Sequence, residues 1–154
     1  MNASTIKVVN ELAKAYLDAY HITISGSIGI NKKTNTNTLK DSNLYKDASV
    51  QALESGNDII VNLLLNDYEV YVENGRKSNK FPPVEPIVRW AKRKGLPTDN
   101  STIFLIRRSI AEKGIQPRPF MNTVFQDMEQ QMDSKFYDKL LESIITDLTK
   151  YFED

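Results

Sequence analysis

The sequence predicts an α+β fold with an N-terminal helix, a small antiparallel sheet built on a hairpin, two short helices and a long C-terminal helix. Three patterns indicate this class. Apolar residues recur at helical spacing near both ends of the chain, two strand-like runs flank a Ser-Gly-Asn turn, and a proline-rich middle holds two helices that each end at a glycine. A length of 154 residues fits a single domain, residues 1–154.

The first helix is predicted over about residues 4 to 20, because its apolar residues recur at steps of three and four. Asn2 or Ser4 is placed to cap it. Apolar residues then alternate from Ile22 to Ile30, which predicts a strand weakened by two glycines. Residues 31–43 hold one apolar residue and no period, so we expect a mobile loop or arm that orders against a partner.

A β-hairpin is predicted next. Residues 44–54 and 58–65 are separated by the turn-forming triplet Ser55-Gly56-Asn57, and the second run is β-branched and apolar enough to be a central strand. Two strands are not stable alone, so we expect the hairpin to pack on the helices. Residues 67–75 fit either a third strand or a single helical turn.

The middle of the chain predicts two short helices. A charged connector, residues 76–80, leads through Phe81-Pro82-Pro83 into a helix from Val84 to Lys94, and Asp99 or Asn100 caps the second helix. The second helix is apolar on more than one side, which predicts that it is buried or covered by a neighbouring subunit.

Each of these helices ends in a glycine and an apolar residue, followed by a proline directly in Gly95-Leu96-Pro97 and one residue later in Gly114-Ile115-Gln116-Pro117. The glycine is expected to take the left-handed conformation, which lets the apolar residue fold back on the helix. The expected contacts are Leu96 toward Ala91 and Ile115 toward Ile110.

The C-terminal residues, from Phe120 onward, predict one long helix or two helices joined by a bend at Asp133-Ser134. Apolar residues recur every four positions from Val124 to Phe152, and each such step drifts by about 40° from a straight helix face. A bend would realign the apolar stripe. We expect this helix to dock on the sheet or on another copy of the chain.

A net charge of zero conceals a strong separation of charge along the chain. Residues 1–75 carry 6 Lys/Arg and 9 Asp/Glu, residues 76–118 carry 11 and 3, and residues 119–154 carry 3 and 8. These charges can neutralise one another within one fold, drive head-to-tail association of copies, or bind a polyanion. The candidate interface with a subunit or a DNA channel consists of Arg76, Lys77, Lys80, Arg89, Lys92, Arg93 and Arg118.

The residue types predict no catalytic residue, no metal site and no cofactor site. The chain has no cysteine and one histidine, His21, which stands at the end of the first predicted helix, where a cap or surface role is typical. No glycine-rich loop of the phosphate-binding type follows a strand. The N-terminus is too polar for a signal peptide, so we expect the chain in the cytosol or in an assembly released from it.

A small nucleic-acid-binding regulator is the alternative, using the basic helix pair at residues 84–113. The two helices and their short connector suit a helix-turn-helix, but the second helix opens with Ile103, Phe104, Leu105 and Ile106, whereas base edges are read by polar side chains. The basic residues could still attract nucleic-acid phosphates without reading the base sequence.

A series of short blocks in the middle of the chain is more specific than any one block. The blocks are Tyr71-Val72-Glu73-Asn74-Gly75-Arg76-Lys77, then Phe81-Pro82-Pro83-Val84 with Ile87, Trp90 and Lys92-Arg93-Lys94-Gly95, then Arg107, Ala111, Lys113-Gly114-Ile115 and Arg118-Pro119-Phe120. Across residues 68–125 the series resembles the minor structural proteins of tailed bacteriophages, the head-tail joining or tail-completion proteins of the neck. Such proteins usually carry Thr-Gly-x-Leu-Arg-x-Ser before their first hairpin; here Leu44-Tyr45-Lys46-Asp47-Ala48 stands in that place, without the Thr-Gly.

The resemblance implies a virion structural protein, assembled in the host cytoplasm, and no enzyme. It implies a homo-oligomeric ring around the channel through which DNA leaves the head, with portal or adaptor proteins on one side and tail proteins on the other. The basic side chains would then also offer a non-specific contact with packaged DNA. No membrane is implied.

Overall fold

The computed structural model describes residues 2–32, 34–66, 69–77 and 80–153. The predicted α+β class is confirmed, with long helices near both termini and small antiparallel hairpins between them. The chain forms two compact units, which are described separately below: unit 1 comprises Met1–Asn66 and Phe120–Asp154, and unit 2 comprises Asp67–Pro119. That the two units together form the single domain expected from the sequence stays a prediction.

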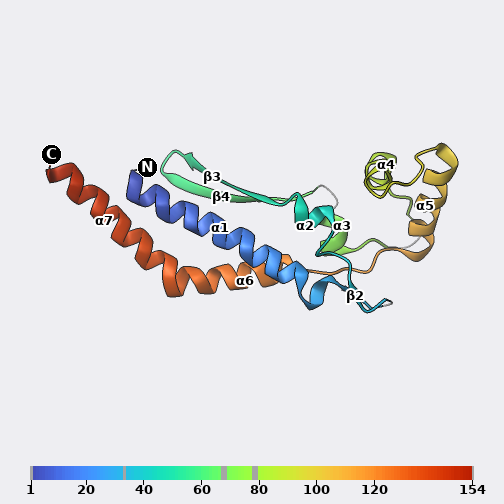
Figure 1. The fold of residues 1–154 in the computed structure, drawn as a ribbon, viewed down its shortest axis with the longest axis horizontal. Helices are drawn as coiled ribbons and strands as arrows, with labels where there is room; N and C mark the ends of the chain where they lie inside the picture. Colours follow the sequence, from blue (N-terminus) through green and yellow to red (C-terminus); the bar gives the residue numbers. More distant parts are fainter. Residues whose placement is uncertain (1, 33, 67–68, 78–79, 154) are drawn as a thin grey trace. The chain divides into compact units, whose positions relative to one another are not determined.

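Unit 1 is layered around α1 (Ala3–Ser25). The antiparallel hairpin of β3 (Ser49–Ser55) and β4 (Asp58–Leu64) lies along one side of α1, and α6 (Met121–Gln131) and α7 (Tyr137–Glu153) lie along the other (Figure 1). The core therefore forms on both sides of α1. Its largest fully buried side chains are Val9, Tyr20, Ile24, Leu44, Phe120, Val124 and Phe136.

Helix α1 runs past its predicted end, and the strand predicted from Ile22 to Ile30 is wrong apart from its last residue. Tyr20 and Ile24 stand one turn apart on one face of α1, and both side chains are fully buried. The hydroxyl of Tyr20 donates to the backbone carbonyl of Leu44 at 2.7 Å. Burial at helical spacing therefore outweighs the alternation of isoleucines, and α1 continues to Ser25.

A short 3₁₀ turn, Ser27–Gly29, follows α1, and the loop after it forms a small ladder of its own. Strand β1 (Ile30–Asn31) pairs with β2 (Thr36–Asn37). The side-chain amide of Asn37 donates to the carbonyl of Gly26 at 3.0 Å, and its oxygen accepts from the N–H of Leu39 at 3.0 Å. Leu39 itself is buried. The mobility expected of this loop stays a prediction, but its described residues are tied to the end of α1.

The predicted hairpin is confirmed in β3 and β4, which are joined by the two-residue turn Gly56-Asn57. Its start is corrected: residues placed at the beginning of the first strand form a helical turn, α2 (Asn43–Lys46), which Ser42 caps. Strand β4 is not central, because the sheet has two strands in the part of the chain that the structure describes. The cross-strand pair Leu53 and Ile60 is accordingly exposed.

Helices α6 and α7 are joined by a π-helical turn, Met132–Phe136, which contains the predicted bend site. Figure 1 shows the helix changing direction there. A π turn is wider than an α turn, so it advances by less than 100° per residue and removes the drift of the apolar stripe. Val124 and Phe136 are both fully buried as a result. Docking on the sheet is wrong, because α6 and α7 pack against α1.

Helices α1 and α7 run antiparallel and are joined by polar contacts along their length. The amine of Lys139 donates to the carboxylate of Glu11 at 3.0 Å, and this hydrogen bond, with the lysine charge, lowers the pKa of Glu11. Further along, the hydroxyls of Ser143 and Thr5 lie 3.5 Å apart. The order of these pairs fixes the direction and register of α7 on α1.

The N-terminus of α1 is capped from α7 rather than by a neighbouring residue. Asn2 lies at the cap position, but its side chain makes no capping hydrogen bond. The buried carboxylate of Asp147 instead accepts from the N–H groups of Ser4 and Thr5, at 3.3 and 3.1 Å, and from the Thr5 hydroxyl at 2.8 Å. A helix N-terminus favours a negative charge, so this contact also suits the helix dipole.

The described residues of unit 2 form three helices: α3 (Glu69–Asn74), α4 (Val84–Arg93) and α5 (Asn100–Lys113). The helical turn is thus the confirmed alternative for the segment before the connector, although residues 67 and 68 lie outside the described part of the chain. The core of unit 2 is small and consists of Val72, Pro82, Ala91, Ile103 and Ala111.

The ends of the two short helices differ from each other. After α4, Gly95 takes the left-handed conformation and the N–H of Leu96 donates to the carbonyl of Ala91 at 2.9 Å, as predicted. After α5, Gly114 also has a positive φ, 68°, but its ψ of −173° is not that of the predicted left-handed conformation, and the backbone of Ile115 pairs with Arg76 instead of turning back along the helix. The start of α5 is capped by Asp99, as predicted.

Candidate interaction surface

The base of unit 2 is formed where two segments of the chain cross. The N–H of Arg76 donates to the carbonyl of Ile115 at 2.9 Å, the reverse bond is 2.8 Å, and the N–H of Arg118 donates to the carbonyl of Val72 at 2.7 Å. Gly75 allows this approach, because a Cβ there would lie 2.5 Å from the Ile115 oxygen. Residues 72–76 and 115–118 therefore form one paired platform.

Two arginines hold the entry to α4 above this platform. The guanidinium of Arg76 donates to the carbonyl of Phe81 at 2.8 Å, and that of Arg107 donates to the carbonyl of Pro82 at 2.8 Å. The Arg107 guanidinium also lies over the Phe81 ring, 5.4 Å from its centre. Arg76, a predicted interface residue, is thus engaged in holding the fold. Arg107 was not predicted for this role, since sequence alone does not indicate which carbonyls lack partners.

The remaining predicted residues fall into two groups. Arg89, Lys92 and Arg93 are exposed and stand three and four residues apart, so they share one face of α4. Lys77 and Lys80 are exposed in the connector before α4, and residues 78 and 79 between them lie outside the described residues. The structure thus brings three of the seven cations onto one helix face.

Arg118, the seventh predicted residue, differs from these exposed cations. Its side chain is half-buried, and burial lowers the pKa of its guanidinium. Its backbone is part of the platform at the base of unit 2. A half-buried arginine that carries a backbone pairing has a structural task in this unit, so Arg118 is a weaker interface candidate than the cations of α4.

Apolar side chains are exposed beside these cations. Helix α5 buries Ile103 on one side while Phe104 and Leu105 are exposed on another. The prediction that the whole helix is buried is therefore wrong, and a covering subunit stays a prediction. Phe104 stacks on Phe81, with 5.9 Å between ring centres. The two rings border a surface hollow of about 510 Å³, whose other lining residues are Arg108, Ala111 and Glu112.

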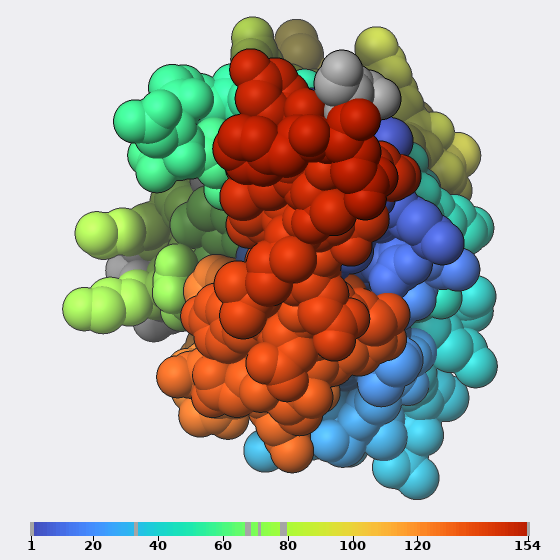
Figure 2. All heavy atoms as spheres, turned by 90° about the vertical axis from the view of Figure 1, so that its left-hand side faces the viewer, coloured from blue at the N-terminus to red at the C-terminus, as the bar shows by residue number. Residues whose placement is uncertain are grey.

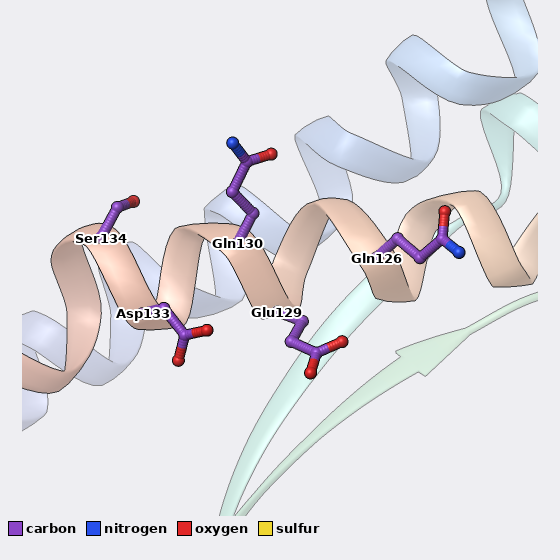
Figure 3. Close-up of a pocket in the computed structure, with 5 residues that line it drawn as sticks. All are labelled: Gln126, Glu129, Gln130, Asp133 and Ser134. Atoms are coloured by element: carbon purple, nitrogen blue, oxygen red, sulfur yellow. The ribbon is translucent and has the colours of Figure 1, made fainter.

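A second hollow, of about 450 Å³, lies along α6 in unit 1 (Figure 3). All its lining residues come from one continuous helix: Gln126, Glu129, Gln130, Asp133 and Ser134. Figure 3 shows Glu129 and Asp133 projecting from one side of this helix and Gln130 and Ser134 from the other. Side chains that diverge from a single helix do not enclose a substrate, so this hollow does not resemble a reaction site.

The remaining polar groups suggest no reaction chemistry in the described residues. His21 lies within α1 rather than at its end; its ring stacks on Tyr45 at 4.1 Å, and its Nε2 lies 3.0 Å from the Tyr45 carbonyl. A carbonyl only accepts, so Nε2 carries the hydrogen and the histidine joins α1 to α2. Across the ranges described, no three His, Asp or Glu residues gather as a potential metal-ligand set.

Charge and exposed apolar area are distributed unevenly between the units. Unit 2 carries 11 Lys/Arg and 6 Asp/Glu, whereas unit 1 carries 9 and 14. Unit 1 also exposes one face of α7, which consists of Tyr137, Leu141, Ile144, Ile145, Leu148, Tyr151 and Phe152. None of the helices in the described ranges is both long and apolar enough to cross a membrane.

Comparison with protein-family models, curated proteins and solved structures finds no match for this chain. Function is therefore inferred from the surfaces described above and from the blocks of residues 68–125.

Proposed function

We propose that this chain is a structural subunit of a tailed-phage virion, a ring-forming connector or tail-completion protein at the head-tail junction. The observation that carries the proposal is the division into a basic unit 2 and an acidic unit 1, each with exposed apolar side chains. Surfaces of opposite charge on one subunit suit head-to-tail contacts between copies. Head-to-tail contacts produce a ring when the rotation from each copy to the next adds up to a full circle.

The phage-like blocks support the proposal because several of their residues have structural tasks in unit 2. Gly75 permits the backbone crossing, Arg107 holds the entry to α4, and Ala111 is buried. Phe120, at the end of the series, is fully buried in unit 1 and contacts Tyr20 edge-on, with 5.7 Å between ring centres. These residues of the blocks thus stabilise the fold, and we assign the contact with a partner to the exposed cations of α4, of which Arg89 also lies 4.0 Å from Glu85.

Mass measurement and electron microscopy of the purified chain test ring formation. We expect closed rings at low ionic strength that dissociate as salt is raised, because salt screens contacts between exposed opposite charges. In the phage that encodes the chain, a stop codon in its gene should leave filled heads and complete tails that fail to join. Normal, infectious particles assembled without the protein would contradict the proposed role.

Charge reversal locates the contact on α4. Lys92→Glu with Arg93→Glu should raise the concentration needed for assembly by at least about tenfold, because like charges would then face the acidic unit of the neighbour. Arg118 is unsuitable for reversal, since its side chain is half-buried. The matched control is Lys14→Glu with Lys46→Glu, which makes the same charge change at exposed positions of unit 1 and should leave assembly intact.

Nucleic-acid binding by the basic helix pair is the rival outcome of these measurements. Arg89, Lys92 and Arg93 could neutralise phosphates, and such binding weakens steeply with salt because counterions are released. The exposed Phe104 and Leu105 at the start of α5 do not suit base reading. A salt-sensitive DNA complex of a monomer or dimer, without rings, would favour the regulator.

A further inference from the structure

The exposed face of α7 has the spacing of a helix-pairing seam. Tyr137, Leu141, Ile144, Leu148 and Tyr151 follow one another at steps of four, three, four and three, which is the heptad spacing of coiled-coil contacts. Ile145 and Phe152 widen the seam on one side. The seven side chains are between 46% and 80% exposed, so the rest of unit 1 leaves the whole seam accessible.

This seam is separate from the face of α7 that packs on α1. The α1-facing residues Phe136, Ser143 and Asp147 are buried, and the seam lies one residue further along the helix, about 100° around its axis. Figure 2 shows α7, in red, lying outermost on this side of unit 1. Helix α7 is therefore held in position by α1 while it presents a second apolar face.

We propose that the α7 seam pairs with the α7 seam of a second copy of this chain, as a two-fold helix-helix contact. At their observed exposures the seven side chains present roughly 800 Å² per copy, which is the contribution of one partner to a standard-size protein interface. Burial of about two thirds of that area on both copies reaches the roughly 1,000 Å² total expected of a specific contact. A matching copy also supplies the same heptad spacing, and a two-fold contact requires such self-complementarity.

The charges beside the seam predict how this contact responds to salt. Asp138 and Glu142 are exposed next to it, and residues 119–154 carry 3 Lys/Arg and 8 Asp/Glu. Two copies therefore meet through an apolar seam with acidic surroundings, and salt should strengthen the pairing by screening their repulsion. The head-to-tail contact of the proposed function has the opposite salt dependence. The α7 contact goes beyond that function and does not require the virion role.

Analytical ultracentrifugation across about 1 to 300 µM chain measures the pairing, with expected affinities in the micromolar range for a short seam. We expect dimers whose dissociation constant falls at least about threefold between 50 and 500 mM NaCl. Leu141→Glu and Leu148→Glu should each weaken pairing at least about tenfold, because each places a charge within the apolar seam. Thr146→Glu, at an exposed α7 position outside the seam, should keep the seam intact.

Cross-linking gives a second readout, because the chain contains no cysteine of its own. With a short bis-maleimide, the Ile145→Cys variant should form a cross-link between two copies, since position 145 lies about midway along the length of the seam. The neighbouring Thr146→Cys variant, outside the seam, should not. A wild type that stays monomeric to 300 µM at high salt overturns the inference, as do equal effects of the seam and control variants. If every assembly of the chain dissociates as salt is raised, the proposed ring is supported and the proposed α7 contact is overturned.

Discussion

Single residues distant in sequence complete local structures in this protein. Asp147 is the clearest case, because it caps a helix that begins more than 140 positions earlier in the chain. Burial of the Asp147 carboxylate raises its pKa, whereas hydrogen bonds from the side chain and backbone of Thr5 and from Ser4 lower it. The hydrogen bonds together outweigh burial, so the pKa of Asp147 lies below its ordinary value. The bond network therefore stabilises the charged form.

Asp147→Asn should lower the melting temperature at pH 7. The folded-state pKa of Asp147 is below the unfolded value of about 3.9, so its charge stabilises the fold above that pH and the contribution is lost as pH falls through the lowered pKa. Thermal unfolding followed by circular dichroism should show the gap to wild type narrowing toward pH 2. Asp138→Asn, at an exposed position of α7, is the control; an equal effect there would contradict the capping role.

Gly75→Ala should destabilise unit 2 more than Gly95→Ala. Both glycines have a positive φ, 67° and 71°, so an alanine at either adds about 1–2 kcal/mol of left-handed strain. A Cβ at Gly75 would in addition lie 2.5 Å from the Ile115 carbonyl oxygen, whereas at Gly95 nothing lies within 4 Å. Urea unfolding measured by Trp90 fluorescence compares the two, and equal losses would mean that the backbone crossing is not tight.

At the scale of elements, the π turn sets how the C-terminal helix meets α1. It holds one more residue than an α turn would need, and it keeps the burial of Val124 before it and Phe136 after it on the same side. Because the turn is internal to a continuous helix, α7 keeps its register on α1, including the contact between Asp147 and Thr5.

Deletion of Ser134 should be tolerated better than deletion of Thr146. Removing one exposed residue from the π turn leaves an ordinary α-helix whose flanking faces stay nearly aligned, so we expect a loss within about 1 kcal/mol. Removing Thr146 rotates everything after it by about 100° and takes Asp147 away from α1. Chemical denaturation of both variants decides, and similar losses would show that the π turn does not correct the register.

Helix and strand signals compete at the end of α1. Alternating isoleucines at 22, 24, 28 and 30 suit a strand, and the same residues also allow a helix that places Ile24 one turn after Tyr20. The helix prevails because the buried face of unit 1 accommodates both side chains. In the extended helix Ile22 faces outward, so its apolar side chain stays exposed to solvent.

For the whole molecule, the single-domain prediction has a direct test. Trp90 is the only tryptophan and lies in unit 2, whereas most of the long helices that dominate circular dichroism lie in unit 1. One cooperative domain should give the same urea midpoint by both signals. Phe136→Ala, expected to remove about 3–5 kcal/mol from the core of unit 1, should then shift the Trp90 transition too. An unchanged Trp90 transition would show that the units unfold independently.

The sequence predicts the candidate surface only in part. The cations at 89, 92 and 93 follow from helical spacing, because α4 is amphipathic and well bounded. The structural use of Arg76 and the half-burial of Arg118 do not follow, because both depend on the crossing of two segments some forty residues apart. Arg107 is missed because its partner carbonyl, that of Pro82, lies 25 residues earlier in the chain, which local sequence patterns do not reveal.

By itself, the sequence determines the fold class, the main hairpin, the two short helices and the place where the C-terminal helix bends, because spacing, turn residues and caps act over a few residues. The tertiary structure alone decides where α1 ends, which side of α7 meets α1, and that Asp147 caps a helix at the other end of the chain. These outcomes depend on which faces become buried together, and burial is a property of the assembled fold.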